Sequence, residues 1–229
     1  MPRGSGLTRI TIVEDHDLFA EALEMAIVLQ GHDVRRVSTA GASTEALLRS
    51  VLRQRPQIAI LDLDLGAAAD GVDLVRPLAG ADVAVIVVSG TTEDSRLGEC
   101  LQLGARGVVA KSSALNAILG AIRRVATGLP AMPREERDQL LATYRHECAD
   151  VRDTRAALAT LSRRESEVLG ALMTGATVTD IAHTSYVSDA TVRTQVKAIR
   201  SKLGVSSQLA AVGAANRARW QPPPRPRTG

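Results

Sequence analysis

The 229-residue sequence has little of three things: aromatic side chains, cysteine and long apolar runs. Phe, Tyr and Trp together make up 2% of the chain, so its cores must be built from Ala, Val, Leu and Ile. No apolar run reaches the roughly eighteen residues of a membrane-spanning helix, and the first ten residues lack the apolar centre of a secretory signal. Cys100 and Cys148 lie far apart without metal-ligand spacing. We therefore expect a cytoplasmic protein with reduced thiols and no membrane association.

The net charge of +3 hides an uneven distribution along the chain. Residues 1–160 hold 18 Lys and Arg against 21 Asp and Glu, whereas residues 161–229 hold 10 against 4. A basic surface is also common on proteins that bind no polyanion. The contrast nevertheless indicates that any nucleic acid would bind the last part of the chain.

Short β-branched runs alternate with segments of helical period from residue 7 to about residue 128. We expect strands at 10–13, 33–38, 57–61, 83–89 and 107–110. We expect helices at 17–30, 43–55, 72–79, 94–103 and 114–127, with N-caps such as Ser43 and Ser113. Five βα units in a row predict an α/β fold for residues 1–127: a doubly wound, five-stranded parallel sheet with helices on both faces.

A charged helix is expected to begin near Arg134, within a linker that covers residues 128–160. Its apolar side chains fall at heptad positions for fewer than three full heptads, which is compatible with two arrangements. One is a linker helix packed lightly on the chain's own domains, which we favour, and the other is a dimerising coiled coil.

Residues 161–219 have helical patterns throughout. A capping box opens at Ser162, Thr177 begins a short second helix, and Ser188 caps a third helix that runs to Leu203 and stops at Gly204. The Pro- and Arg-rich segment 220–229 is expected to be disordered. The sequence thus predicts an all-α helix-turn-helix domain followed by a tail.

Polar residues follow the predicted strands where ligands bind in open parallel sheets. Glu14 and Asp15 follow the first strand, Asp62 ends the third, Ser89 the fourth, and Lys111 follows the fifth. Three clustered carboxylates repel one another unless a hard cation binds them, and Mg²⁺ is the natural one. The set matches phosphoryl transfer to Asp62, with the Lys111 ammonium stabilising phosphoryl charge and Ser89 donating to the product.

Residues 7–127 resemble the receiver domain of bacterial two-component response regulators, through "IVEDH", "ILDLDL", Asp70-Gly71, "VIVVSG" and "GARGVVAKS". The resemblance implies that Asp62 accepts the phosphoryl group, that Glu14 and Asp15 bind Mg²⁺, and that Asp64 offers its backbone carbonyl to the metal. The chain departs from the family at Gly66, where Pro is usual, in one extra residue before Asp70-Gly71, and at Val108, where an aromatic switch residue is usual. The chemical set is complete, but Val108 has no ring to couple phosphorylation to a dimerisation surface. Either the coupling runs through backbone shifts of the loop at residues 89–95, or this receiver responds weakly to phosphate.

The third helix of the C-terminal part has one apolar and one polar face. Val192, Val196, Ile199 and Leu203 must face the core. Residues 161–205 resemble the LuxR-type DNA-binding domain, whose recognition helix enters the major groove. The resemblance implies base contacts for Arg193, Thr194 and Lys197 and phosphate contacts for Ser188 and Thr191, while Gln195 replaces a frequent His. We expect Arg200 and Lys202 to lie on phosphates as well.

Both resemblances, in this order, are typical of the NarL/FixJ class of response regulators. They imply a transcription factor that is phosphorylated by a partner histidine kinase, binds promoter DNA as a homodimer on two half-sites, and is no enzyme beyond catalysing its own phosphotransfer and dephosphorylation. The main alternative is an atypical regulator that binds DNA without phosphate and responds to a ligand, a partner or its own abundance. A small-molecule phosphatase is disfavoured, because no second general acid or base accompanies the acidic cluster.

Overall fold

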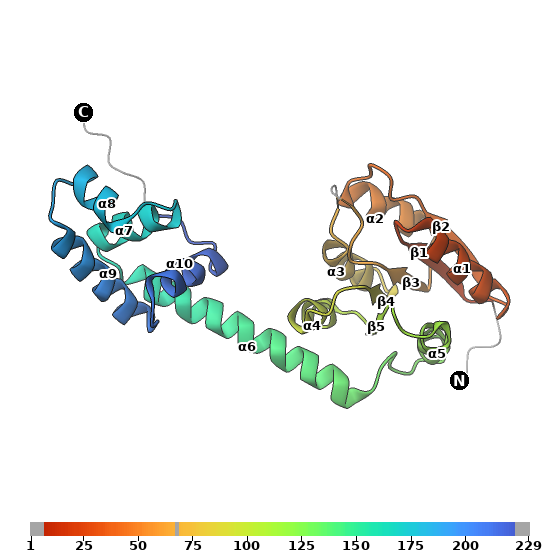
Figure 1. The fold of residues 1–229 in the computed structure, drawn as a ribbon. Coiled ribbons are helices and arrows are strands. Elements are labelled where there is room, and N and C mark those ends of the chain that lie inside the picture. The colour runs from red at the N-terminus through yellow and green to blue at the C-terminus, as the bar shows by residue number, and fades with distance from the viewer. Residues whose placement is uncertain (1–6, 67–68, 223–229) are drawn as a thin grey trace. The chain divides into compact units, whose positions relative to one another are not determined.

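The computed structural model describes residues 7–66 and 69–222. The chain divides into two compact units, Met1–Arg145 and His146–Gly229, and Figure 1 labels the elements of each. Among the helices of the described residues, none is long and apolar enough to span a membrane.

The first unit is built on a five-stranded parallel sheet with the strand order β2-β1-β3-β4-β5. Its strands are β1 (Arg9–Val13), β2 (Asp33–Val37), β3 (Ile58–Leu61), β4 (Ala84–Ser89) and β5 (Gly107–Ala110). The central strand β3 is buried along its whole length and pairs in register with β1 and β4, Leu61 lying opposite both Val13 and Val87. The predicted five-stranded doubly wound fold is confirmed.

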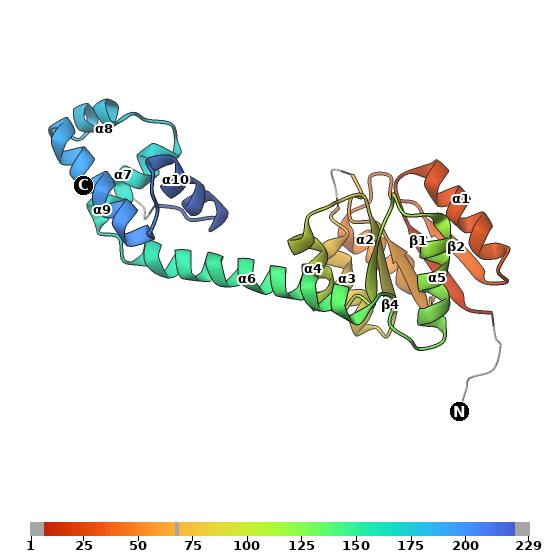
Figure 2. The same ribbon diagram turned by 60° about the horizontal axis from the view of Figure 1, so that its bottom comes forward.

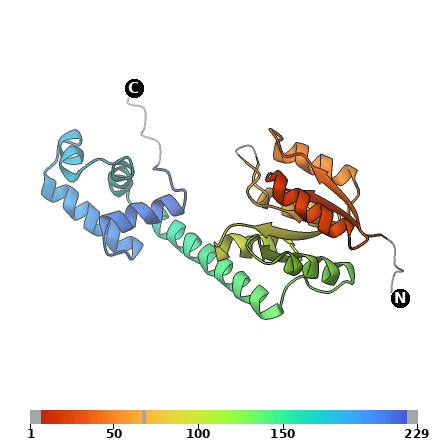
Figure 3. The ribbon, with the colours of Figure 1, turned by 45° about the vertical axis from the view of Figure 1, so that its right-hand side comes forward.

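Helices cover both faces of the sheet, as Figure 2 shows. Five of them follow the strands: α1 (Asp17–Val28), α2 (Thr44–Arg53), α3 (Val72–Gly80), α4 (Asp94–Leu103) and α5 (Leu115–Ala126). One apolar core joins α1 and α5 to the sheet, on the side that Figure 3 presents, and the other joins α2, α3 and α4 to the opposite face. Ser43 caps α2 as expected, but Ser113 was wrong as a cap: α5 begins after Ala114, without a side-chain cap.

The long helix α6 (Arg134–Ala159) contributes to both units. In its first half, Leu140 and Leu141 are buried in the core of the α4 face. Arg137 donates hydrogen bonds to two carbonyls at the end of α4, those of Leu101 (3.4 Å) and Ala105 (3.1 Å). The first half of the predicted linker helix therefore packs on the first unit, where Leu140 and Leu141 complete the core.

The second unit is all-helical, with α7 (Arg163–Met173), α8 (Val178–Thr184), α9 (Asp189–Leu203) and α10 (Gln208–Arg217). Its core also takes in Leu158 from the end of α6. The predicted caps are present, with capping boxes at Ser162 and Thr177 and an N-cap at Ser188.

The predicted disordered tail starts too early. Trp220 packs against the core of the second unit, and its backbone N–H donates to the carbonyl of Ala215 at 2.9 Å. The prediction for 223–229 lies outside the described residues.

Candidate functional site

The carboxyl ends of the strands bring the predicted acceptor set together in the first unit. The side chain of Asp62 is 0% exposed and that of Glu14 is 3% exposed. Lys111 Nζ donates to both carboxylates, at 2.7 Å to Asp62 Oδ2 and 2.8 Å to Glu14 Oε1. The backbone N–H of Leu63 donates to the other oxygen, Asp62 Oδ1, at 2.7 Å. One ammonium therefore joins side chains that are 97 and 49 residues from it in the sequence.

Burial and charge oppose each other at Asp62. Burial raises the pKa of its carboxyl, and the neighbouring carboxylate of Glu14 adds to the rise, while the hydrogen bond from Lys111 lowers it. Burial alone would lower the pKa of Lys111, but its bonds to Asp62 and Glu14 outweigh burial, so that the pKa of Lys111 is raised. The ammonium also lies 5.4 Å from the centroid of the Phe19 ring, within the range of a cation–π contact. Lys111 is thus held in its charged form, and its hydrogen bond opposes the effect of burial on the pKa of Asp62.

Four side chains gather where a cation would sit. Ligand atoms of Glu14, Asp15, His16 and Asp62 all lie within 4.8 Å of one another. Carboxylate oxygens are the donors that Mg²⁺ prefers, so the three acids fit that ion. His16 was not predicted, although it directly follows the acidic pair. Its Nδ1 lies 2.8 Å from Asp15 Oδ1 and 3.1 Å from Glu14 Oε1, and the bond to Glu14 is the main cause of its raised pKa.

The remaining predicted residues of this edge have distinct surroundings. Ser89 is buried and its Oγ accepts a hydrogen bond from the N–H of Thr91 at 3.2 Å. The side chain of Asp64 turns away to Arg96, with Arg96 Nη1 at 3.2 Å from Asp64 Oδ1. Val108 is 8% exposed and belongs to the same core as Leu141 of α6. The position where the family has an aromatic switch is therefore covered by apolar packing.

In the second unit, α9 exposes the polar face that the sequence predicted. Val192, Val196 and Ile199 are buried, whereas Arg193 and Lys197 are exposed. Thr191 and Thr194 are exposed on the same helix, and the Thr194 hydroxyl donates to the carbonyl of Ala190, at 3.0 Å. Ser188 Oγ accepts the N–H of Thr191 at 3.2 Å. Ser188 is thus an N-cap as well as a candidate phosphate contact.

Two residues that are predicted to contact phosphates, Arg200 and Lys202, have intramolecular partners in this structure. Lys202 Nζ donates to Glu165 Oε2 at 2.7 Å and to the carbonyl of Thr160 at 3.0 Å, which ties the end of α9 to the start of α7. The guanidinium of Arg200 donates to the carbonyl of Ser206. The structure gives Lys202 a structural role that the helix pattern could not reveal, because Glu165 is 37 residues away.

Comparison with known proteins agrees with both units. Residues 10–123 match the model of the response regulator receiver domain, and residues 159–215 match that of the bacterial regulatory proteins of the luxR family. A probable transcriptional regulatory protein NarL of Mycobacterium tuberculosis is 31% identical over 92% of this chain and 94% of its own length. The chain belongs to the NarL/FixJ class of two-component response regulators.

More distant relatives share the whole arrangement. The DNA-binding transcriptional activator DevR/DosR of M. tuberculosis is 28% identical over 95% of this chain and 98% of its own. The RcsB response regulator of Salmonella typhimurium is similar in fold, with a TM-score of 0.53 and 22% identity over 93% of this chain and 99% of that one. The receiver match and the luxR-family match together make this chain a DNA-binding response regulator.

Proposed function

We propose that Asp62 of this response regulator accepts a phosphoryl group from a partner histidine kinase, and that the phosphorylated protein binds promoter DNA as a homodimer in the cytoplasm. The observation that carries the proposal is the double contact of Lys111 Nζ, at 2.7 Å from Asp62 and 2.8 Å from Glu14. It joins charged groups that follow β1, β3 and β5 at one edge of the sheet, which supports the proposal, because a solvated surface cluster would not be buried in this way.

The transfer needs an ionised carboxylate and a means of stabilising phosphoryl charge. An oxygen of Asp62 attacks phosphorus while the bond from phosphorus to the kinase's histidine nitrogen breaks. That nitrogen keeps the electron pair, and because the ring carries a proton on its other nitrogen it leaves as neutral imidazole. The product is an acyl phosphate on Asp62. Lys111 holds Asp62 ionised before the transfer and is in reach of a phosphoryl oxygen after it.

Glu14, Asp15 and Asp62 would hold Mg²⁺, with the carbonyl of Asp64 as a further ligand. When bound, the ion would neutralise charge on the phosphoryl oxygens. Ser89 is buried on the neighbouring strand end, where its hydroxyl would donate to the phosphoryl group.

Intact-mass measurement after incubation with a small phosphodonor such as acetyl phosphate and Mg²⁺ tests the acceptor. We expect one added phosphoryl group in the wild type and none in Asp62→Asn. The matched control is Asp73→Asn, which removes an exposed carboxylate of α3 and should still be labelled. Labelling of Asp62→Asn would contradict the assignment.

Regulation without phosphate is the second candidate, and the buried Val108 in place of an aromatic switch favours it. Beryllofluoride with Mg²⁺ separates the two candidates. Phosphate control predicts a change in oligomeric state and in DNA affinity. If neither changes while Asp62 can still be phosphorylated, the protein is a phosphorylation-independent regulator.

For the DNA-binding unit we propose that Arg193, Thr194 and Lys197 face base edges and that Ser188 and Thr191 meet phosphates. Exposure of Lys197 on the face opposite the buried Val196 supports this. Lys197→Ala should weaken binding to the specific site by about 1–3 kcal/mol and binding to random duplex much less. Arg164→Ala, which removes an exposed cation paired with Glu167, serves as the control. Equal losses on both duplexes would mean that Lys197 contacts only phosphate.

A further inference from the structure

The loop between β3 and α3 closes directly behind the acceptor residue. Asp64 and Asp70 form an isolated antiparallel bridge, and the N–H of Gly71 donates to the carbonyl of Leu63 at 2.9 Å. A Cβ at Gly71 would lie only 2.0 Å from the carbonyl oxygen of Asp62. The returning chain thus packs against the backbone of Asp62, so a displacement of the loop would also displace the backbone of that residue.

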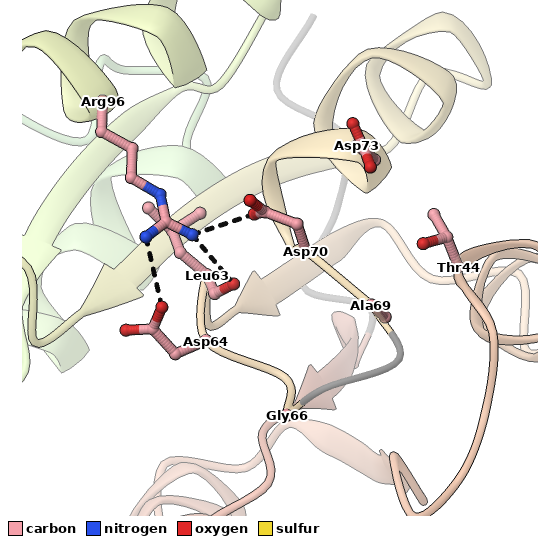
Figure 4. Close-up of a pocket in the computed structure, with 8 residues that line it drawn as sticks. All are labelled: Thr44, Leu63, Asp64, Gly66, Ala69, Asp70, Asp73 and Arg96. Carbon is pink, nitrogen blue, oxygen red and sulfur yellow. Dashed lines mark hydrogen bonds and ion pairs between the residues drawn. The ribbon is translucent and has the colours of Figure 1, made fainter. Parts of the chain in front are cut away.

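Arg96 of α4 joins the two sides of this loop, as Figure 4 shows. Its Nη1 donates to Asp64 Oδ1 at 3.2 Å and its Nη2 to Asp70 Oδ1 at 3.0 Å. Nη2 also lies 3.4 Å from the carbonyl oxygen of Leu63. The Arg96 side chain is 26% exposed, and its two ion pairs overcome the effect of burial, so that its pKa is raised. One planar guanidinium therefore spans both ends of the loop.

Without Arg96, two carboxylates would face each other across the bridge. Like charges directly opposite on paired chains destabilise the pairing. At Gly66 the φ of +85° is a conformation that glycine adopts freely, so this residue adds no steric restraint to the path of the loop. Opening at the bridge would move the backbone of Asp64, which follows the acceptor by two residues.

We propose that Arg96 is a positioning residue for the magnesium site: by bridging Asp64 and Asp70 it holds the backbone carbonyl of Asp64 where the metal needs it. This inference rests on the proposed function, in which that carbonyl is a metal ligand. Arg96 itself touches neither the metal nor the phosphoryl group. It acts through the loop, in the way that groups behind metal ligands orient them.

If Arg96 acted only through its charge, its removal would change the Mg²⁺ affinity in the direction opposite to a loss of positioning. Arg96 is a cation near an acidic site, so its removal by Arg96→Gln leaves the site more negative and would tighten Mg²⁺ binding. Loss of positioning weakens Mg²⁺ binding. The conservative Arg96→Lys keeps the charge but loses the planar fork that reaches both carboxylates.

Isothermal titration calorimetry of Mg²⁺ into the full, unphosphorylated chain tests the proposal. We expect Arg96→Gln to weaken the affinity about tenfold and Arg96→Lys to weaken it by less. Arg49→Gln serves as the matched control, because Arg49 forms an exposed ion pair with Glu45 on α2, and its affinity should equal that of the wild type. Circular dichroism shows whether each variant is folded. If Arg96→Gln does not fold, the Mg²⁺ affinity of Arg96→Lys relative to the wild type tests the proposal.

The outcomes separate this inference from the proposed function. If the wild type binds Mg²⁺ and Arg96→Gln binds it equally or more tightly, the positioning role of Arg96 is overturned and the proposed magnesium site stands. Equal affinities of wild type and Arg96→Lys would likewise overturn the role of the fork. Absence of Mg²⁺ binding in the wild type would overturn the magnesium site and this inference together.

Discussion

Gly98 offers a test of how α6 is attached to the sheet domain. It lies within α4, and a Cβ added there would be 2.2 Å from the carbonyl oxygen of Leu140 and 2.8 Å from Tyr144 Cβ. Both partners are on α6, so Gly98→Ala forces the two helix backbones apart. The separation would loosen the packing of Leu140 and Leu141, which are buried in the shared core.

The magnitude follows from two opposing effects. Replacing Gly by Ala inside a helix favours the folded state by about 1 kcal/mol, whereas forcing an extra methyl group into a packed interface costs about 1–3 kcal/mol. Gly120, in the middle of α5, isolates the first effect, since its nearest heavy atom would be Arg123 Nη2 at 3.9 Å. We therefore expect Gly98→Ala to be less stable than Gly120→Ala by the packing cost, about 1–3 kcal/mol.

Urea unfolding followed by far-ultraviolet circular dichroism measures the difference in stability, and hydrogen exchange locates it. In Gly98→Ala the amides of residues 138–145 should exchange faster, while those of the central strand β3 (Ile58–Leu61) keep their protection. Equal stability of the two variants, with unchanged exchange in α6, would refute the close packing of α6 on α4.

Three further predictions concern titrating groups. Burial raises the pKa of Asp62 above its ordinary value of 3.8, so the folded domain loses stability as the pH rises from that value through the raised pKa. At pH 7 without Mg²⁺, Asp62→Asn should therefore have a higher Tm than the wild type, and a lower Tm would contradict this. The hydrogen bond from Lys202 lowers the pKa of Glu165 below the ordinary value of 4.5. The pair therefore stabilises the second unit above pH 4.5, and this stabilisation is lost as the pH falls through the lowered pKa. Glu165→Gln should flatten the acid part of the pH–Tm curve, and an unchanged curve would refute the prediction. Burial raises the pKa of the Cys100 thiol to about 12, whereas Cys148 is exposed. Only the Cys148 thiol should therefore react quickly with a disulfide reagent at pH 8, and fast reaction of both thiols would contradict the burial of Cys100.

The fold could be predicted because its signals are local. The strand runs of the first unit are β-branched and buried on both faces, and the strand ends then place Asp62, Glu14 and Lys111 on one edge by topology alone. Caps such as Ser162 and Ser188 are read from residues three positions apart.

Most of what the sequence could not show involves contacts between distant residues. The bond from Lys202 to Glu165 and the clamp of Arg96 on Asp64 and Asp70 join side chains between 26 and 37 residues apart, and neither set has a spacing that marks it. The requirement for glycine at Gly98 likewise exists only because α6 returns to α4. Polar contacts and close backbone approaches of this kind carry no periodic signal of their own.

Three of the long-range contacts in the first unit lie on α4. Near its beginning, Arg96 grips the loop behind the acceptor; in its middle, Gly98 lies against the backbone of α6; and at its end, Leu101 accepts a hydrogen bond from Arg137 of α6. Because α4 and the first half of α6 are closely packed, we expect a displacement of α4 to shift α6 as well. The side chain of Val108 has no ring that could change its exposure, and it is buried in the core that α6 completes. In this response regulator a series of contacts through α4 therefore joins the loop after Asp62 to the first half of α6, and the absence of a side chain at Gly98 allows the two helix backbones to lie in contact.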